Sequence, residues 1–103
     1  MTKIVKINFS DKSQLDNLDL QIKKAYTEND KVKFVFDLTN LSVADASNIT
    51  IFIKLIEKYK SEEHKLECID FVCPKSHTIK RSLLKKCVKM AKVSKPVYLV
   101  EKA

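Results

Sequence analysis

The sequence predicts an α/β fold, with a small, mostly parallel sheet of about four strands and three amphipathic helices. Four short runs rich in β-branched and aromatic residues alternate with three segments whose apolar residues recur every three or four positions. The connections between these elements are short. Such alternation is typical of a parallel sheet with right-handed crossovers. A chain of 103 residues has the length of one domain, which we expect to cover residues 1–103.

The first half of the chain predicts two strands separated by a helix. Lys3–Phe9 partly alternates apolar residues with Lys6 and Asn8, as a strand does. Val32–Leu38 is apolar on both faces after Val32, so we expect an inner strand. Between them, the segment 13–28 carries the apolar stripe of an amphipathic helix, made by Leu15, Leu18, Ile22, Ala25 and Tyr26.

The second half predicts two more helices and two more strands. A strand is expected over Leu66–Cys73, ended by Pro74, and another over the final KPVYLV. Ser76 can cap the helix between these two strands. The helix before them has an apolar stripe made by Ile49, Phe52, Ile53, Ile56 and Tyr59.

The composition excludes several classes of protein. Because glycine is absent, glycine-rich phosphate loops and dinucleotide-binding fingerprints are excluded. No apolar run reaches the roughly 18–20 residues that span a bilayer, and MTKIVKINFS lacks the features of a secretory signal. Cys68, Cys73 and Cys87 cannot all pair within the chain and lie in apolar patterns typical of buried thiols. These features predict a soluble protein of a reducing, cytoplasmic compartment.

Neither a metal site nor a catalytic site is predicted. Four side chains that bind metals fall in one stretch: His64, Cys68, Cys73 and His77. The odd separation of Cys68 and Cys73 places them on opposite faces of one strand, and no Cys-x-x-Cys motif is present. Cys73 and His77 lack an evident third group that would orient a nucleophile and its base. We therefore expect a non-enzymatic protein without a cofactor.

The basic residues are concentrated in the last third of the chain. Residues 71–103 hold nine basic residues and one acid, a balance of +8, whereas residues 1–70 have a balance of −1. Five lie on or next to the helix expected over residues 76–90, and the last four of them are spaced by three or four positions along one outer face: Lys80, Arg81, Lys85, Lys89 and Lys92. Such a face could bind nucleic acid or an anionic surface, or it could be a solvated lysine-rich face, since no aromatic residues are interleaved with it.

The strand-to-helix segment VKFVFDLTNLSVADASNITIFIKLIEKYK, residues 32–60, resembles the centre of a STAS domain, the family of the bacterial anti-sigma factor antagonists. That family has a strand ending in Asp-Leu-Ser-Gly and then Asp-Ser-Ser-Gly-Leu at the start of a helix. Asp37 and Thr39 fit the first motif, and Asp45 and Ser47 fit the second. The similarity extends over residues 4–101, and in the second motif Ala46 and Asn48 replace a serine and a glycine.

The resemblance implies a regulatory module that docks a kinase-like or anti-sigma-like protein through Asp45, Ala46, Ser47 and Asn48. It also implies that Ser47 is the residue which a partner kinase phosphorylates. Asp45 or Ser47 would serve equally well as the N-cap of the following helix, a role compatible with phosphorylation. Members of the family linked to transporters suggest a further alternative, an accessory subunit of a membrane transporter complex. No small-molecule substrate is inferred.

Overall fold

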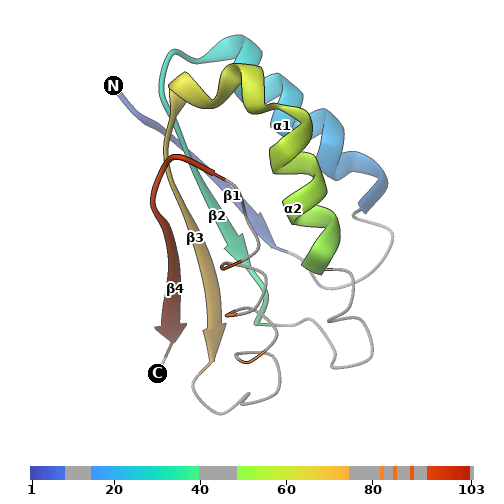
Figure 1. The fold of residues 1–103 in the computed structure, drawn as a ribbon, viewed down its shortest axis with the longest axis vertical. Helices are drawn as coiled ribbons and strands as arrows, with labels where there is room; N and C mark the ends of the chain where they lie inside the picture. Colours follow the sequence, from blue (N-terminus) through green and yellow to red (C-terminus); the bar gives the residue numbers. More distant parts are fainter. Residues whose placement is uncertain are drawn as a thin grey trace.

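Four parallel strands form one sheet in the computed structural model, which describes residues 1–8, 15–39, 49–74, 82, 85, 89 and 93–102 (Figure 1). The strands follow one another across the sheet in chain order: β1 (Lys3–Asn8), β2 (Val32–Asp37), β3 (Leu66–Pro74) and β4 (Val97–Lys102). All three neighbouring pairs are parallel. The predicted α/β fold is confirmed, and β2 is an inner strand as its apolar sequence predicted.

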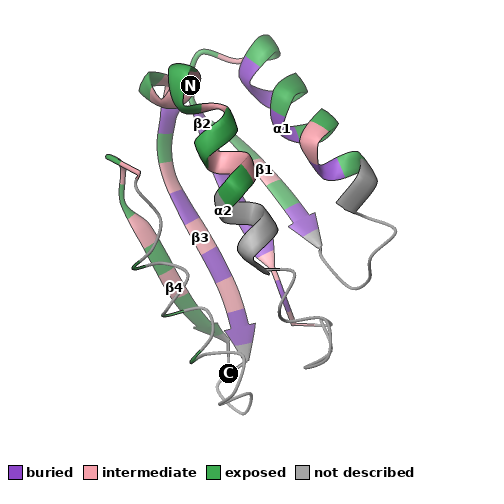
Figure 2. Cartoon of the chain, turned by 45° about the vertical axis from the view of Figure 1, so that its right-hand side comes forward, coloured by how far each residue is buried: buried purple, intermediate pink, exposed green. Residues whose placement is uncertain are grey.

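Helices α1 (Leu15–Glu28) and α2 (Ile49–Lys58) lie side by side over one face of the sheet (Figures 1 and 2). The described apolar side chains of both helices turn toward that face, since Leu55 and Ile56 of α2 pack against the core and four residues of α1 are buried in it. A short 3-10 helix, η3 (Lys60–Lys65), follows α2 and was not predicted. In the third predicted helical segment, positions 82, 85 and 89 are helical.

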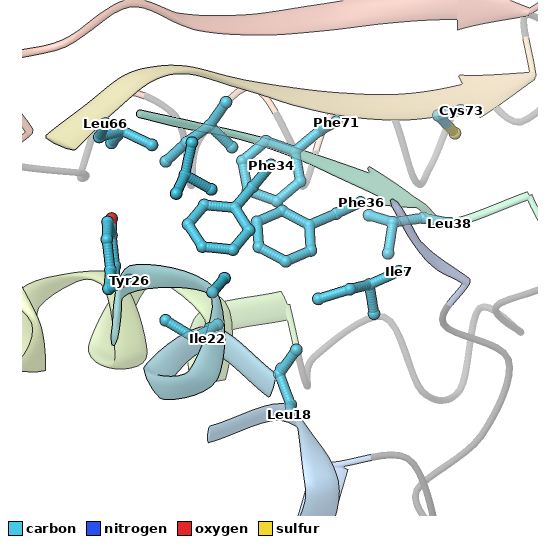
Figure 3. Packing of buried hydrophobic residues seen from close by; sticks show 13 residues of the cluster. Ile7, Leu18, Ile22, Tyr26, Phe34, Phe36, Leu38, Leu66, Phe71 and Cys73 are labelled. Carbon is cyan, nitrogen blue, oxygen red and sulfur yellow. The ribbon is translucent and has the colours of Figure 1, made fainter. Parts of the chain in front are cut away.

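The core lies between α1 and the covered face of the sheet (Figure 3). Phe36 stands at its centre, with its ring stacked near those of Phe34 and Phe71 at centroid distances of 5.8 and 5.4 Å. Tyr26 of α1 meets Phe34 edge to face at 5.4 Å. These large aromatic rings, contributed by neighbouring strands and a helix, supply much of the apolar area that stabilises the fold.

An irregularity in the pairing of β2 with β3 places β3 residues of both parities in the core. Val32 pairs with Leu66, but the next residue, Lys33, pairs with Cys68, so one extra residue sits in β3. A bulge of this kind shifts the alternation of side chains by one position. Leu66 and Ile69, an odd number of residues apart, are therefore both buried.

The opposite face of the sheet is open at its two edge strands. Ile4 of β1 and Tyr98 and Val100 of β4 are exposed large apolar side chains on this face. Near its middle, the Lys33 ammonium lies 3.2 Å from the Asp70 carboxylate. The described part of the sheet thus has one face covered by α1 and α2 and one face of mixed apolar and charged character.

Candidate functional site

The carboxyl end of β2 is fixed by a side-chain turn. Asp37 accepts hydrogen bonds from the backbone N–H of Thr39 at 3.0 Å and from the Thr39 hydroxyl at 2.5 Å. The N–H of Leu38 donates to the carbonyl of Val72 in β3 at 2.9 Å, and Leu38 is fully buried. An aspartate that bonds its own backbone two residues on is a common way to end a strand. Asp37 and Thr39 therefore set where the chain leaves the sheet.

The predicted docking residues follow this turn along the chain. Asp45, Ala46, Ser47 and Asn48 lie outside the described residues, within the stretch 40–48 that connects Thr39 to the first residue of α2. The strand that leads into this stretch, β2, lies between β1 and β3. In open parallel sheets, binding sites gather beyond the carboxyl ends of the strands.

The structure describes two of the five residues of the predicted basic face. Lys85 and Lys89 are helical and exposed, as the predicted outer face of the helix requires. They are four positions apart and therefore share one side of the helix. Lys80, Arg81 and Lys92 lie outside the described residues.

Cys68 and Cys73, which the sequence suggested as possible metal ligands, lie on different faces of β3. Cys73 is buried in the core beneath the helices, whereas Cys68 is half-buried on the open face. Burial, and then the nearby Asp70 carboxylate, raise the pKa of the Cys68 thiol, which disfavours the reactive thiolate. Within the described ranges, no three His, Cys, Asp or Glu side chains are grouped so as to hold a metal ion.

A polar cluster that the sequence did not predict joins α1 to the end of α2. The Asp19 carboxylate accepts a hydrogen bond from the Tyr59 hydroxyl and lies 2.6 Å from the Lys58 ammonium. Both carboxylate oxygens are thus engaged. These two hydrogen bonds, the one from Lys58 first, lower the pKa of Asp19. With Leu20 and Lys23, the three residues line an open groove of about 420 Å³. The cluster fastens one helix to the other.

This cluster predicts an acid-dependent component of stability. The ionised form of Asp19 is favoured in the folded state, so its contribution is present above the ordinary aspartate pKa of 3.8 and is lost as the pH falls through the lower folded value. We expect Asp19→Asn to be less stable than the wild type at neutral pH, with the difference shrinking below pH 3.8. Urea denaturation across this pH range measures the effect. Asp30→Asn, at an exposed site, is the control for the loss of a surface charge.

Comparisons with models of protein families, with curated proteins and with solved structures found no match. The resemblance to STAS domains therefore stays a prediction from the motif residues. No helix in the described ranges combines the length and the apolar content that crossing a membrane requires.

Proposed function

We propose that this protein is a non-enzymatic interaction module that docks a regulatory protein at the carboxyl edge of its sheet. The docking surface consists of Asp45, Ala46, Ser47 and Asn48. The partner is a kinase-like or anti-sigma-like protein, as the STAS resemblance implies.

The observation that carries this proposal is the position of β2 in the sheet. Because β2 is an inner strand of an all-parallel sheet, the stretch 40–48 begins in the middle of the carboxyl edge. The Asp37–Thr39 turn and the bond from Leu38 to Val72 fix that starting point. A segment that starts from a rigid scaffold in this way is suited to recognition by another macromolecule.

The chemistry of Ser47 supports its role as the control point. Ser47 lies two residues before Ile49, the first residue of α2, so it is close to the helix end where unpaired N–H groups and the positive end of the helix dipole favour negative charge. A phosphoryl group adds a charge of about −1.5 to −2 and three strong acceptor oxygens. Phosphorylation would therefore be tolerated by the fold while it changes the charge of the docking surface.

Phosphate mapping tests this proposal. The protein is incubated with ATP and a lysate of the organism that encodes it, and the phosphorylated residues are identified by mass spectrometry. We expect phosphate at Ser47, abolished in Ser47→Ala and retained in Ser82→Ala, which alters an exposed helical serine as a matched control. Phosphate on other residues with Ser47 unmodified contradicts the proposal.

A second candidate function, polyanion binding, is favoured by the exposure of Lys85 and Lys89 on one side of a helix. Salt-dependent retention of the variants on heparin and on DNA distinguishes polyanion binding from the docking of a regulatory protein. If the basic helix is the functional surface, Lys85→Gln and Lys89→Gln reduce retention while Ser47→Ala leaves it unchanged. Capture of a transporter subunit by the wild type would instead support the accessory-subunit alternative.

A further inference from the structure

A small basic pocket is lined by residues at the opposite edge of the sheet, where the strands begin. The strands begin in the upper part of Figure 1. Its volume is about 170 Å³. The residues that line it come from the connections before β2, β3 and β4 and from the start of β3 itself: Lys31, His64, Lys65, Leu66, Glu67 and Lys95. Three lysines and a histidine thus line one cavity, although 30 or more positions of the chain separate each lysine from the next.

The backbone around Lys95 is anchored on both sides. The N–H of Ser94 donates to the Glu63 carboxylate at 2.5 Å, and the carbonyl of Pro96 accepts from the N–H of Ile69 at 3.0 Å. These bonds attach the turn before β4 to η3 and to β3. Lys95 is therefore presented to the pocket by a fixed backbone, which reduces the ordering that ligand binding would require.

Lys31 and Lys65 are positioned by similar contacts. The carbonyl of Lys31 accepts from the N–H of Lys3 at 2.9 Å, which fixes the chain just before β2. The Lys65 ammonium donates to the carbonyl of Tyr26 at 3.0 Å and lies 2.9 Å from the Glu62 carboxylate. Two of its three N–H donors are thus used, and the third is left for a ligand.

The charges of the pocket are not balanced by its own residues. In the described part of the chain, neither Lys31 nor Lys95 has an ion-pair partner, although Lys95 is half-buried. The one carboxylate in the lining, Glu67, accepts a hydrogen bond from the Thr2 hydroxyl. A cavity lined by three lysines and one carboxylate favours an anionic ligand.

We infer that this pocket binds the phosphoryl group of a small molecule, held by the ammonium groups of Lys31, Lys65 and Lys95 and by the ring of His64. A phosphoryl group carries a charge of about −1.5 to −2, opposite in sign to the three lysines of the lining, which outnumber its single carboxylate, Glu67. Lysine binds phosphate as a point charge without the planar geometry that arginine imposes.

The size of the pocket limits what it can enclose. Sites that enclose a whole drug-sized ligand have volumes of about 300–1,000 Å³, larger than the 170 Å³ found here. The pocket would therefore enclose a phosphoryl or pyrophosphoryl group, while the rest of the molecule extends into solvent. This site lies where the strands begin, whereas Thr39, the last described residue before the stretch 40–48, follows the carboxyl end of β2, so the inference does not depend on the docking proposal.

Titration of the isotope-labelled protein with pyrophosphate at constant ionic strength tests the inference by NMR. We expect saturable shifts of the amide signals of Lys31, Leu66 and Lys95. Lys31→Gln and Lys95→Gln should each weaken binding by about tenfold, as expected for the loss of one hydrogen bond from a charged donor. Lys24→Gln and Lys54→Gln, at exposed positions of α1 and α2, are matched controls that should leave the affinity unchanged.

A variant that should bind pyrophosphate more tightly is also needed, because a misfolded variant can lose affinity but does not gain it. Glu67→Gln retains an acceptor for Thr2 but removes the carboxylate from the lining, so it should tighten pyrophosphate binding. The inference is overturned if Glu67→Gln fails to tighten binding, if all four lysine variants lose affinity equally, or if succinate binds as tightly as pyrophosphate. Shifts confined to Lys85 and Lys89 would also overturn it, because the anion would then be bound at the basic helix.

Discussion

Phe36→Ala should lower the free energy of unfolding by about 3–5 kcal/mol, the usual range for removing a fully buried phenyl ring. Phe36 has no exposed surface, and its ring lies between those of Phe34 and Phe71. Truncation would remove the contacts of the ring and leave a cavity that neighbouring rings cannot fill without leaving their rotamers. The loss is a large fraction of the roughly 5–15 kcal/mol that stabilises a domain. Urea denaturation followed by circular dichroism measures it.

Two further variants make this measurement interpretable. Phe36→Leu keeps most of the apolar volume, so it should lose less than the alanine variant and remain folded if Phe36→Ala does not. Tyr98→Ala removes an aromatic ring from a side chain that is 53% exposed on the open face of β4, and we expect a loss below about 1 kcal/mol. Equal losses in the free energy of unfolding for Phe36→Ala and Tyr98→Ala would contradict a core that lies between α1 and the sheet.

Leu18→Ala should lower the free energy of unfolding by about 2–5 kcal/mol, because Leu18 attaches α1 to the sheet. Its side chain is 1% exposed and belongs to the core. Leu20, two residues further along the same helix, is 64% exposed. Leu20→Ala makes the same chemical change at a similar place in the helix, so we expect a change within about 0.5 kcal/mol.

The difference between Leu18→Ala and Leu20→Ala measures packing and not helix propensity, because both variants replace leucine with alanine in the same helix. Thermal and urea unfolding of both variants under one set of conditions gives the difference directly. If Leu20→Ala were the more destabilising of the two, α1 would have to present a different face to the sheet.

The positions of the strands and helices followed from local patterns in the sequence. Val32–Asp37 forms an inner strand, as its apolar residues at both parities predicted, and Leu18, Ile22 and Tyr26 are buried, as the helical spacing predicted. Periodicity reports which side of an element avoids water, and that property is local. The boundaries that the structure describes differ by only a few residues: β2, for example, ends at Asp37 in the structure and at Leu38 in the prediction.

Features that depend on distant contacts were not predictable from periodicity. The order of the strands is one of them, and the extra residue in β3 opposite Val32 and Lys33 is another. The contact of Asp19 with Lys58 and Tyr59 joins residues about 40 positions apart, so the local pattern around Asp19 gave no sign of it.

Of the candidate sites, one was indicated by a local motif in the sequence and the other depends on distant contacts. The motif resemblance singled out Asp37 and Thr39, and the structure places both in the turn that ends β2. The basic pocket gave no signal in the sequence because Lys31, Lys65 and Lys95 belong to three separate connections. Only the parallel arrangement of the strands, which collects their beginnings at one edge, brings these lysines together.

The chain order of the strands bears on how the protein is synthesised. Each strand pairs with the one made before it, so a growing sheet always has an edge ready for the next strand to leave the ribosome. In the described part of the chain, every buried residue of the core falls between Ile7 and Cys73, and β4 contributes only partly buried side chains. The apolar centre can therefore assemble before β4 has been translated, and the last strand joins a template that already exists.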